Sequence, residues 1–256
     1  MNKYEKWPKQ EIFLEIFIPP ETAFFVRLDG WNFKKLSEKI KTEKPFDERF
    51  AKCLVSSGKT LFDEGFSPAL IYVVSDELNV LFIDAAPFRR RVEKINSVLA
   101  SLISSAFTVN LKRFFNKENK IAFDSRIIII PNEKKIIDYL GWRQTGAWRN
   151  HNNAYAYWFF RKMGLKPSEI SRKLEGLKTK ELHEILFKQG VNLAKTPQWQ
   201  RRGILLHKQP FTRKIQNHPI TRWKTQEKWN LPLFLSKEGI KLIKQVLNWT
   251  RQKRKS

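Results

Sequence analysis

Apolar residues in the first half of the chain follow two spacings, one typical of strands and one typical of amphipathic helices. Four short runs are rich in β-branched and aromatic residues, and two longer segments carry apolar residues at every third or fourth position. The strands are expected at 21–28, 69–74, 78–83 and 121–130, and the helices at 46–65 and 87–114. The order is therefore strand, helix, strand, strand, helix, strand.

This order predicts an α+β domain with a ferredoxin-like βαββαβ sheet. A right-handed crossover makes the first and second strands parallel, and the third strand lies between them, antiparallel to both. The end of the first strand and the turn that enters the third strand then share one edge of the sheet. Asp29, in VRLDGWNF, ends the first strand, and Asp76 lies in that turn. We therefore expect these two carboxylates to be neighbours.

The second half of the chain is expected to be mostly helical. Helical spacing continues after residue 132, a strand is expected at 203–209, and a helix is expected in the segment that follows Leu235. We expect two units, which are the βαββαβ domain at 1–135 and a helical, basic extension at 136–256 that packs on it.

Positive charge is strong and unevenly distributed. The chain has 49 Lys and Arg against 25 Asp and Glu, a net charge of +24. Residues 201–256 contain fifteen of the basic residues, opposed only by Glu227 and Glu238, and aromatic residues are interleaved with them. This pattern favours a nucleic acid as partner over a membrane. The alternative is a basic surface that is merely solvated.

Several other classes of protein are disfavoured by the sequence. No apolar run approaches the roughly 18 residues of a membrane span, and the N-terminus lacks the apolar segment of a signal peptide. Cys53 is the only cysteine, which excludes an internal disulfide, and its place in an apolar helical stripe favours a core residue over a nucleophile. The chain has no zinc spacing, phosphate-binding P-loop or dinucleotide fingerprint. We expect a cytoplasmic protein.

The chemistry of Asp29 and Asp76 favours a metal site. Two neighbouring carboxylates repel each other unless a cation lies between them. Mg²⁺ binds one or two protein carboxylates together with nucleotide phosphates, and a pair of such ions supports phosphoryl transfer. Gly30 lets the chain approach a triphosphate, and backbone N–H groups of residues 30–34 can donate to it if they open a helix. The alternative is two unrelated turns, because Asp-Gly and Ser-Asp-Glu are both common turn sequences.

From about residue 22 to residue 207 the sequence resembles the tRNA-histidine guanylyltransferase family, including its archaeal-type relatives. The ordered segments that carry the resemblance include VRLDGWNF (26–33), EKPFDERF (43–50), VSDELNVLF (74–82), FDSRIIIIPNEKKIIDYLGWRQ (123–144) and HEILFKQGVN (183–192). The resemblance implies a polymerase-like palm that uses two Mg²⁺ ions, ATP, GTP or other NTPs to add nucleotides 3′→5′ to the 5′ end of tRNA. It also implies a homotetramer.

The resemblance assigns roles to individual residues. Asp29 and Asp76 match the metal-binding aspartates, and Gly30 matches a glycine whose carbonyl binds metal. Glu77 is implied as a catalytic residue, with a solvated hairpin residue as the alternative. Nucleotide contacts are implied at the two aspartates and at Gly30, Trp31, Asn32, Phe33, Lys34, Lys44, Asp47, Ser75, Arg90 and Arg126.

The sequence departs from the family pattern at three places. Trp31 replaces an arginine, Ser125 replaces a glycine, and AWRNHNNAYAYW (147–158) replaces a motif linked to choosing the tRNA. Contacts with tRNA are expected at Arg149, Asn150, His151, Arg201 and Arg202, although Asn150 and His151 equally fit a polar helix cap. Untemplated guanosine addition to tRNA-histidine and templated repair of truncated tRNA both stay open.

Two rival functions fit a palm fold. One is an RNA-binding protein that has lost its chemistry, but Asp29, Ser75 and Asp76 are all present. The other is a nucleotide cyclase, which would have no use for the basic C-terminal segment.

Overall fold

The first four strands form the predicted ferredoxin-like arrangement. The computed structural model describes residues 10–215 and 218–255. These strands are β1 (Ala23–Gly30), β2 (Leu70–Val74), β3 (Glu77–Phe82) and β4 (Phe123–Ile130). They belong to a six-stranded sheet in the order β4-β1-β3-β2-β5-β6, in which β1 pairs antiparallel with β3 and β4, and β3 pairs antiparallel with β2. The expected sheet is therefore confirmed, with β1 and β2 parallel on the two sides of β3.

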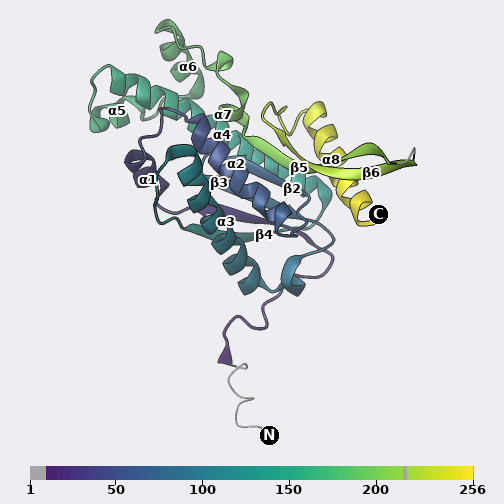
Figure 1. Cartoon of the computed structure of the whole chain (residues 1–256). Helices are drawn as coiled ribbons and strands as arrows, with labels where there is room; N and C mark the ends of the chain where they lie inside the picture. Colours follow the sequence, from purple (N-terminus) through teal and green to yellow (C-terminus); the bar gives the residue numbers. More distant parts are fainter. Residues whose placement is uncertain (1–9, 216–217, 256) are drawn as a thin grey trace.

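Helices α2 (Glu48–Asp63) and α3 (Val92–Phe115) cover one face of this sheet (Figure 1). Alternate residues of β1, such as Val26 and Leu28, are fully buried against them. The helix predicted at 87–114 begins later than expected. Residues 87–90 form a 3₁₀ turn, η2 (Pro87–Arg90), in which Phe88, Arg89 and Arg90 all have positive φ. A short helix, α1 (Phe33–Lys39), follows β1 directly.

The second half of the chain covers the other face of the same sheet. A single long helix, α4 (Glu133–Lys162), and the C-terminal helix α8 (Lys237–Lys255) pack there. Their residues Leu140, Val246 and Leu247 are fully buried with Phe25 of β1 and Leu81 of β3. Helices α4 and α8 of the C-terminal half therefore complete the core of the βαββαβ sheet.

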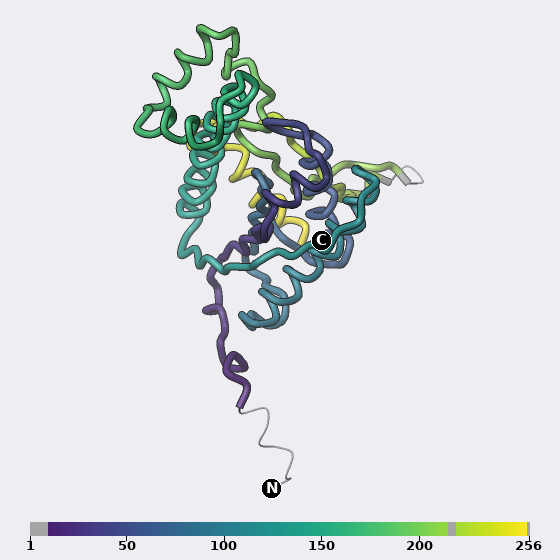
Figure 2. The backbone as a smooth tube through the Cα atoms, turned by 90° about the vertical axis from the view of Figure 1, so that its left-hand side faces the viewer, coloured from purple at the N-terminus to yellow at the C-terminus, as the bar shows by residue number. Residues whose placement is uncertain are grey.

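The strand expected at 203–209 is present and extends farther than predicted. β5 (Ile204–Ile215) joins the sheet beside β2. β6 (His218–Lys228), which the sequence pattern did not predict, pairs with residues 205–215 of β5. β2 pairs only with residues 204–206 of β5. The inner part of the hairpin packs on α8, where His207 stacks on Trp249, and its outer part projects from the body as a two-stranded ribbon, as Figures 1 and 2 show.

The remaining helices form a small cluster at the end of α4. They are α5 (Pro167–Leu174), α6 (Thr179–Lys188) and α7 (Gln198–Arg202), with the 3₁₀ turn η3 (Leu193–Lys195). Ala156 of α4 is fully buried with Leu186 of α6 in this cluster. None of the helices in the described ranges is long and apolar enough to cross a membrane. The expected absence of a signal peptide concerns mainly residues 1–9, which lie outside the described part of the chain.

Candidate active site

Asp29 and Asp76 meet at one edge of the sheet, as the topology predicted. The backbone N–H of Gly30 donates to the carbonyl oxygen of Asp76 over 3.1 Å, which ties the end of β1 to the turn between β2 and β3. In the strand register Asp29 lies directly opposite Glu77 of β3 on one side and Asp124 of β4 on the other. Residues that lie opposite each other project from the same face of a sheet. The edge therefore carries a row of three carboxylates, with Asp76 beside it.

These four carboxylates differ in their partners. Glu77 forms an ion pair with Arg143 at 2.5 Å, and Asp124 lies 3.3 Å from Arg126. Asp29 and Asp76 have no Lys or Arg within ion-pair distance among the residues that the structure describes, although the chain has a large excess of basic residues. Burial raises the pKa of Asp76 above its usual value, and the nearby Asp29 and Glu77 charges raise it further, against a hydrogen bond from Ser75. A cation beside the two aspartates would relieve this unfavourable interaction.

The donor set at this edge fits Mg²⁺ that arrives with a nucleotide. No group of three or more His, Cys, Asp or Glu side chains suited to a metal occurs in the described ranges, so a site with only protein ligands is not formed there. Mg²⁺ seldom uses such a site, because it keeps several waters and binds one or two carboxylates together with substrate phosphates. Asp29 and Asp76 supply those two carboxylates, and the backbone carbonyl of Gly30 is the third donor that we expected.

The segment from Gly30 to Lys34 connects β1 to α1 in a tight bend. The N–H groups of Gly30 and Trp31 are used within the fold, by the carbonyls of Asp76 and Ala122. Two of the five N–H groups expected to face a triphosphate are therefore already bonded. Asn32 takes the left-handed conformation before α1, which leaves the N–H groups at the start of that helix as candidate phosphate donors.

Within this bend the side chains of Trp31 and Phe33 lie in opposite environments. Trp31 is 68% exposed, whereas the Phe33 ring is buried among Phe50, Phe107 and Phe123. A Cβ on Gly30 would lie 2.5 Å from the Phe33 ring, so glycine is required for close packing at this position. The Phe33 side chain therefore holds the bend in place from the core side.

A pocket of about 360 Å³ opens next to Asp76. Its lining includes the basic residues Lys34 and Lys44, the turn residues Ser75 and Asp76, and the aromatic residues Phe46 and Trp199. The Lys44 ammonium donates to the Ser37 hydroxyl over 2.9 Å, and burial lowers its pKa. The pocket thus combines ammonium groups, aromatic rings and the edge with the two aspartates, which suits a nucleoside triphosphate.

Asp47 lines this pocket but directs its carboxylate into the protein. It is the N-cap of α2 and accepts hydrogen bonds from the backbone N–H groups of Glu43 and Arg49 and from the Arg49 side chain. Burial alone would raise the pKa of Asp47, but these hydrogen bonds and the Arg49 charge hold it below its usual value. Asp47 therefore shapes the loop around Lys44, and its carboxylate is already engaged.

Glu77 is neither solvated nor free. Its side chain is buried, which makes the solvated-hairpin alternative wrong. The carboxylate accepts two hydrogen bonds from the Arg143 guanidinium, at 2.7 and 2.5 Å, and one from the Asn79 amide at 2.8 Å. Three of the roughly four lone-pair positions of this carboxylate are therefore used within the fold, and a catalytic role for Glu77 stays a prediction.

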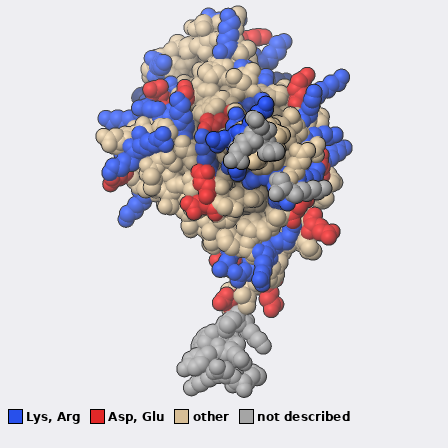
Figure 3. All heavy atoms as spheres, turned by 45° about the vertical axis from the view of Figure 1, so that its right-hand side comes forward, with Lys and Arg blue, Asp and Glu red and all other residues tan. Residues whose placement is uncertain are grey.

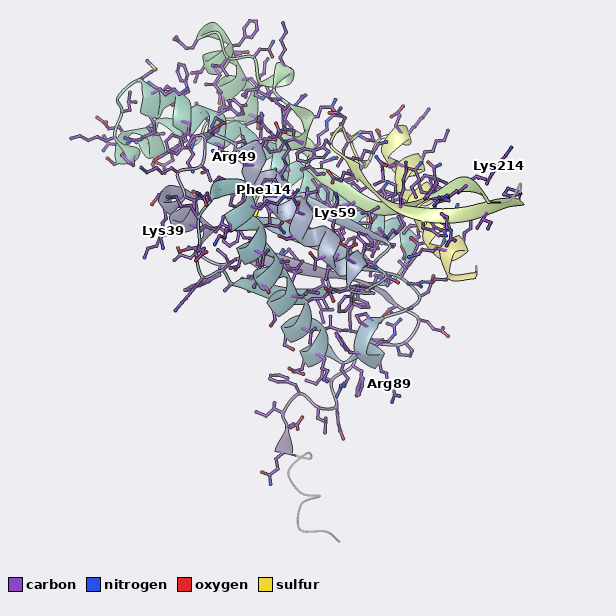
Figure 4. All side chains as sticks on the ribbon, in the orientation of Figure 1. Lys39, Arg49, Lys59, Arg89, Phe114 and Lys214 are labelled. Atoms are coloured by element: carbon purple, nitrogen blue, oxygen red, sulfur yellow. The ribbon has the colours of Figure 1, made fainter. Side chains whose placement is uncertain are left out.

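Arg90 lies away from the carboxylate edge within this chain. Its guanidinium donates to the carbonyls of Pro19 and Thr22, which precede β1, whereas Asp29 is near the other end of that strand. Figure 4 shows the neighbouring Arg89 in the lower part of the body, well away from Arg49 of α2. Arg126 is nearer, on β4 opposite Arg27, and is exposed beside Asp124. A nucleotide contact at Arg90 stays a prediction.

The five residues expected to contact tRNA fall into three groups, which are exposed, buried and partly exposed. Arg149 and Asn150 are exposed on α4, and Asn150 lines the pocket. His151 is fully buried, is hydrogen-bonded to Asn152 and Thr196, and stacks on Trp148 with an interplanar angle of 7°. Direct contact between His151 and tRNA is therefore excluded in this conformation.

Neither Asn150 nor His151 caps a helix, because both lie within α4, and that alternative is wrong. Burial, with help from the Arg201 charge, lowers the pKa of His151 to about 4.

Arg201 and Arg202 are only partly exposed. Arg202 donates to the carbonyl of Leu231, and its own carbonyl accepts from Tyr72, so it anchors the C-terminal segment to β2. Arg201 has its Nε buried without a hydrogen-bond partner. A contact of either with tRNA stays a prediction.

Sequence reasoning missed two groups of residues at this site. Arg143 lies on the helix behind the carboxylate edge, and no spacing links it to Glu77. Trp199 and Gln200 reach the pocket from α7, after a long separation in sequence. The prediction that Cys53 is a core residue is confirmed, since it is fully buried and burial raises the pKa of its thiol.

Comparison with known proteins gives consistent matches along the chain. The model of the family described as tRNAHis guanylyltransferase matches residues 4–131, and that of the Thg1 C terminal domain matches residues 134–246. A tRNA(His) guanylyltransferase from Candida glabrata is 32% identical over 196 residues, which are 73% of this chain and 83% of the relative. One from Schizosaccharomyces pombe is 29% identical and covers 90% of this chain and 85% of its own length.

Solved structures show the same architecture. The crystal structure of tRNA(His) guanylyltransferase from Saccharomyces cerevisiae matches with a TM-score of 0.72 and 27% identity, covering 86% of this chain and 96% of that one. A bacterial tRNA(His) guanylyltransferase-like protein in complex with ATP matches with a TM-score of 0.71 at 23% identity, over 91% of this chain and 93% of that one. The second likeness concerns the fold alone.

Proposed function

Because this chain belongs to the tRNAHis guanylyltransferase family and is an enzyme of that family, we propose that it transfers nucleotides to the 5′ end of tRNA in the 3′→5′ direction. We further propose that the reaction depends on Mg²⁺ held by Asp29 and Asp76. The observation that carries both proposals is the carboxylate edge. Two aspartates with no basic partner among the described residues meet there, next to a pocket that contains Lys34 and Lys44.

The residues of the site would have two roles, which are to hold Mg²⁺ and to position the substrates. When bound, Mg²⁺ supplies charge that makes the attacking hydroxyl more acidic and neutralises the leaving group. Lys34 and Lys44 line the pocket from the α1 side and would position polyphosphate, which is most of what this chemistry requires. Phe46 and Trp199 offer rings on which a base can stack.

The proposed reaction has two chemical stages. The 5′-monophosphate of the tRNA is first activated by ATP, which releases pyrophosphate, unless a 5′-triphosphate is already present. The 3′-hydroxyl of an incoming NTP then attacks the 5′ phosphorus. A new phosphodiester bond forms, and AMP or pyrophosphate leaves with the electron pair of the broken bond.

An aspartate comparison tests the metal site. Asp29→Ala and Asp76→Ala should each lower nucleotide addition by more than about 100-fold, while tRNA affinity and fold stay close to wild type. Asp124→Ala is the matched control, because Asp124 lies opposite Asp29 in the same row but is near Arg126. Addition by either of the first two variants at a hundredth of the wild-type rate or more would contradict the assignment.

We also propose that nucleotide choice is templated, as in the repair of truncated tRNA. The segment 147–158 departs from the motif linked to choosing tRNA-histidine, and His151 within it is buried. Contacts to phosphate and metal discriminate little between bases, so pairing with the opposite acceptor strand would decide which NTP is added.

A homotetramer and a cytoplasmic location remain part of the proposal.

Competition among NTPs tests templated addition. Four tRNA transcripts that lack the first nucleotide, each with a different opposing base, should each accept the NTP that pairs with that base. Incorporation of GTP into all four would instead favour untemplated guanosine addition, with Arg149 and Asn150 as the residues to test for tRNA choice.

A further inference from the structure

A bidentate ion pair lies directly behind the turn that carries Asp76. Glu77 follows Asp76 in sequence and is the first residue of β3, and Arg143 reaches it from α4. The Nε of Arg143 donates to Oε1 of Glu77 over 2.7 Å, and one terminal nitrogen donates to Oε2 over 2.5 Å. Both side chains are largely shielded from solvent, at 6% exposure for Glu77 and 21% for Arg143.

Further contacts fix the geometry of this pair. The Asn79 amide donates to Glu77 and to the carbonyl of Tyr72, and its own oxygen accepts from the Tyr139 hydroxyl over 2.7 Å. The Arg143 guanidinium also lies over the Trp142 ring, 4.8 Å from its centroid. The pair therefore belongs to a network that joins α4 to β2 and β3.

We propose that Arg143 is a positioning residue for the metal site, acting through Glu77. Glu77 is bonded covalently to Asp76 and lies opposite Asp29 in the register, so its position sets the spacing of both aspartates. The planar guanidinium of Arg143 donates two hydrogen bonds to Glu77 from the α4 side. This bidentate contact fixes the orientation of the carboxylate as well as its distance. Glu77 is then neither acid, base nor metal ligand. The inference rests on the proposed function and names residues that support its site.

Charge compensation is a second way in which Arg143 would support the metal site. Without it, Glu77 would be a third uncompensated carboxylate next to Asp29 and Asp76, and it would repel both. A cation drawn to Glu77 would also lie away from the pocket. With Arg143 paired to Glu77 and Arg126 paired to Asp124, the carboxylates at this edge that lack an ion-pair partner among the described residues are Asp29 and Asp76.

The ion pair between Arg143 and Glu77 also connects the metal site to the pocket through helix α4. Arg143 lies on the same helix as Ala147, Asn150 and Ala154, which line the pocket. α4 therefore supports the Asp76 turn and also supplies part of the lining of the pocket. A positioning defect should appear in metal use and turnover more than in affinity for tRNA.

The test compares Arg143→Met, Glu77→Gln and the double variant. Support by a neighbouring group of this kind changes metal affinity or activity by about 10- to 100-fold, and we expect each single variant to lose that much turnover. The Mg²⁺ concentration for half-maximal addition should rise, with KM for tRNA nearly unchanged. Because the two residues act as one unit, the double variant should lose no more turnover than the more impaired of the two single variants.

Two further variants complete the design. Arg143→Lys keeps a positive charge beside Glu77 but loses the bidentate hydrogen bonds. Its turnover and its Mg²⁺ dependence should lie between those of wild type and Arg143→Met. Lys59→Ala breaks a separate ion pair between α2 and Glu227 of β6, and should leave Mg²⁺ dependence unchanged (Figure 4 labels Lys59). Thermal unfolding of every variant shows whether it is folded under the assay conditions.

A binding measurement keeps this inference separate from the proposed function. Electron paramagnetic resonance of Mn²⁺ with GTP reports metal binding without turnover, and Arg143→Met should weaken it about 10-fold or more. Absence of addition by the wild-type chain would contradict the proposed function, whereas unchanged Mn²⁺ binding in a folded Arg143→Met would overturn the positioning role. A Glu77→Gln variant far less active than Arg143→Met would show that Glu77 acts in the chemistry itself.

Discussion

Asp76 shows at the scale of one residue how function opposes stability at this site. It is partly buried beside two other carboxylates, and no basic side chain of the described residues is near enough to compensate it. Groups that a metal or substrate must reach are often unsatisfied in the free protein. The same burial that makes Asp76 costly without metal makes it a strong ligand when a cation arrives.

Asp76→Asn should therefore stabilise the metal-free protein. The raised pKa means that ionising Asp76 costs folding free energy as the pH rises through that pKa. If the relief is about 1 kcal/mol at pH 7, Tm should rise by roughly 2–4 °C in EDTA. The gain should vanish below about pH 3, where the carboxyl is protonated in both the folded and the unfolded state. Mg²⁺ with GTP should raise the Tm of wild type and not of the variant.

His151 should make the protein sensitive to mild acid. Its pKa is lowered to about 4 by burial, whereas an unfolded histidine titrates near 6.5. The unfolded state thus binds the proton first, and stability should fall by roughly 1.4 kcal/mol for each pH unit between those values. His151→Gln should flatten this slope in urea unfolding at pH 7, 6 and 5. An unchanged slope would show that His183 and His207, whose pKa values are also lowered, account for it.

At the scale of elements, the sequence predicted what local periodicity and topology determine. The strand order and the meeting of Asp29 with Asp76 follow from the βαββαβ pattern. β6 was missed because HPITRWKTQEK has no alternating apolar face, and its pairing is imposed by β5. The direction of the Arg90 side chain could not be predicted, because three successive residues with positive φ redirect the chain without any glycine to signal it.

Docking of α8 on the sheet should depend on Gly239. A Cβ there would overlap the carbonyl oxygen of Leu233 and lie 2.6 Å from the Cα of Phe234, and backbone cannot move aside as a side chain can. Gly239→Ala should destabilise the protein by about 1–3 kcal/mol or more. Gly146→Ala in α4 is the control, because nothing lies within 4 Å of its Cβ position. It should be neutral or stabilise by up to about 1 kcal/mol, so equal Tm values would contradict this packing.

At the scale of the whole molecule, positive charge extends well beyond the site. Figure 3 brings the hairpin side forward and shows Lys and Arg side chains over much of this face. The projecting part of the β5–β6 hairpin carries Arg213, Lys214, Arg222 and Lys224, all exposed, and no acidic residue. Figure 4 shows Lys214 near its far end, away from the body. Deleting the C-terminal segment would not isolate this charge, because α8 and Phe234 belong to the core.

Neutralising the hairpin tests whether its charge binds RNA. Changing Arg213, Lys214, Arg222 and Lys224 to Gln should leave the fold intact, since all four are exposed. For each phosphate that the variant no longer neutralises, the slope of log K against log salt should fall by roughly 0.7–0.9, because fewer counterions are released on binding. The effect should be the same for tRNAs of different sequence. The matched control changes four exposed lysines elsewhere, Lys94, Lys134, Lys180 and Lys188. Equal slopes for the hairpin variant and wild type would mean that this charge only keeps the protein in solution.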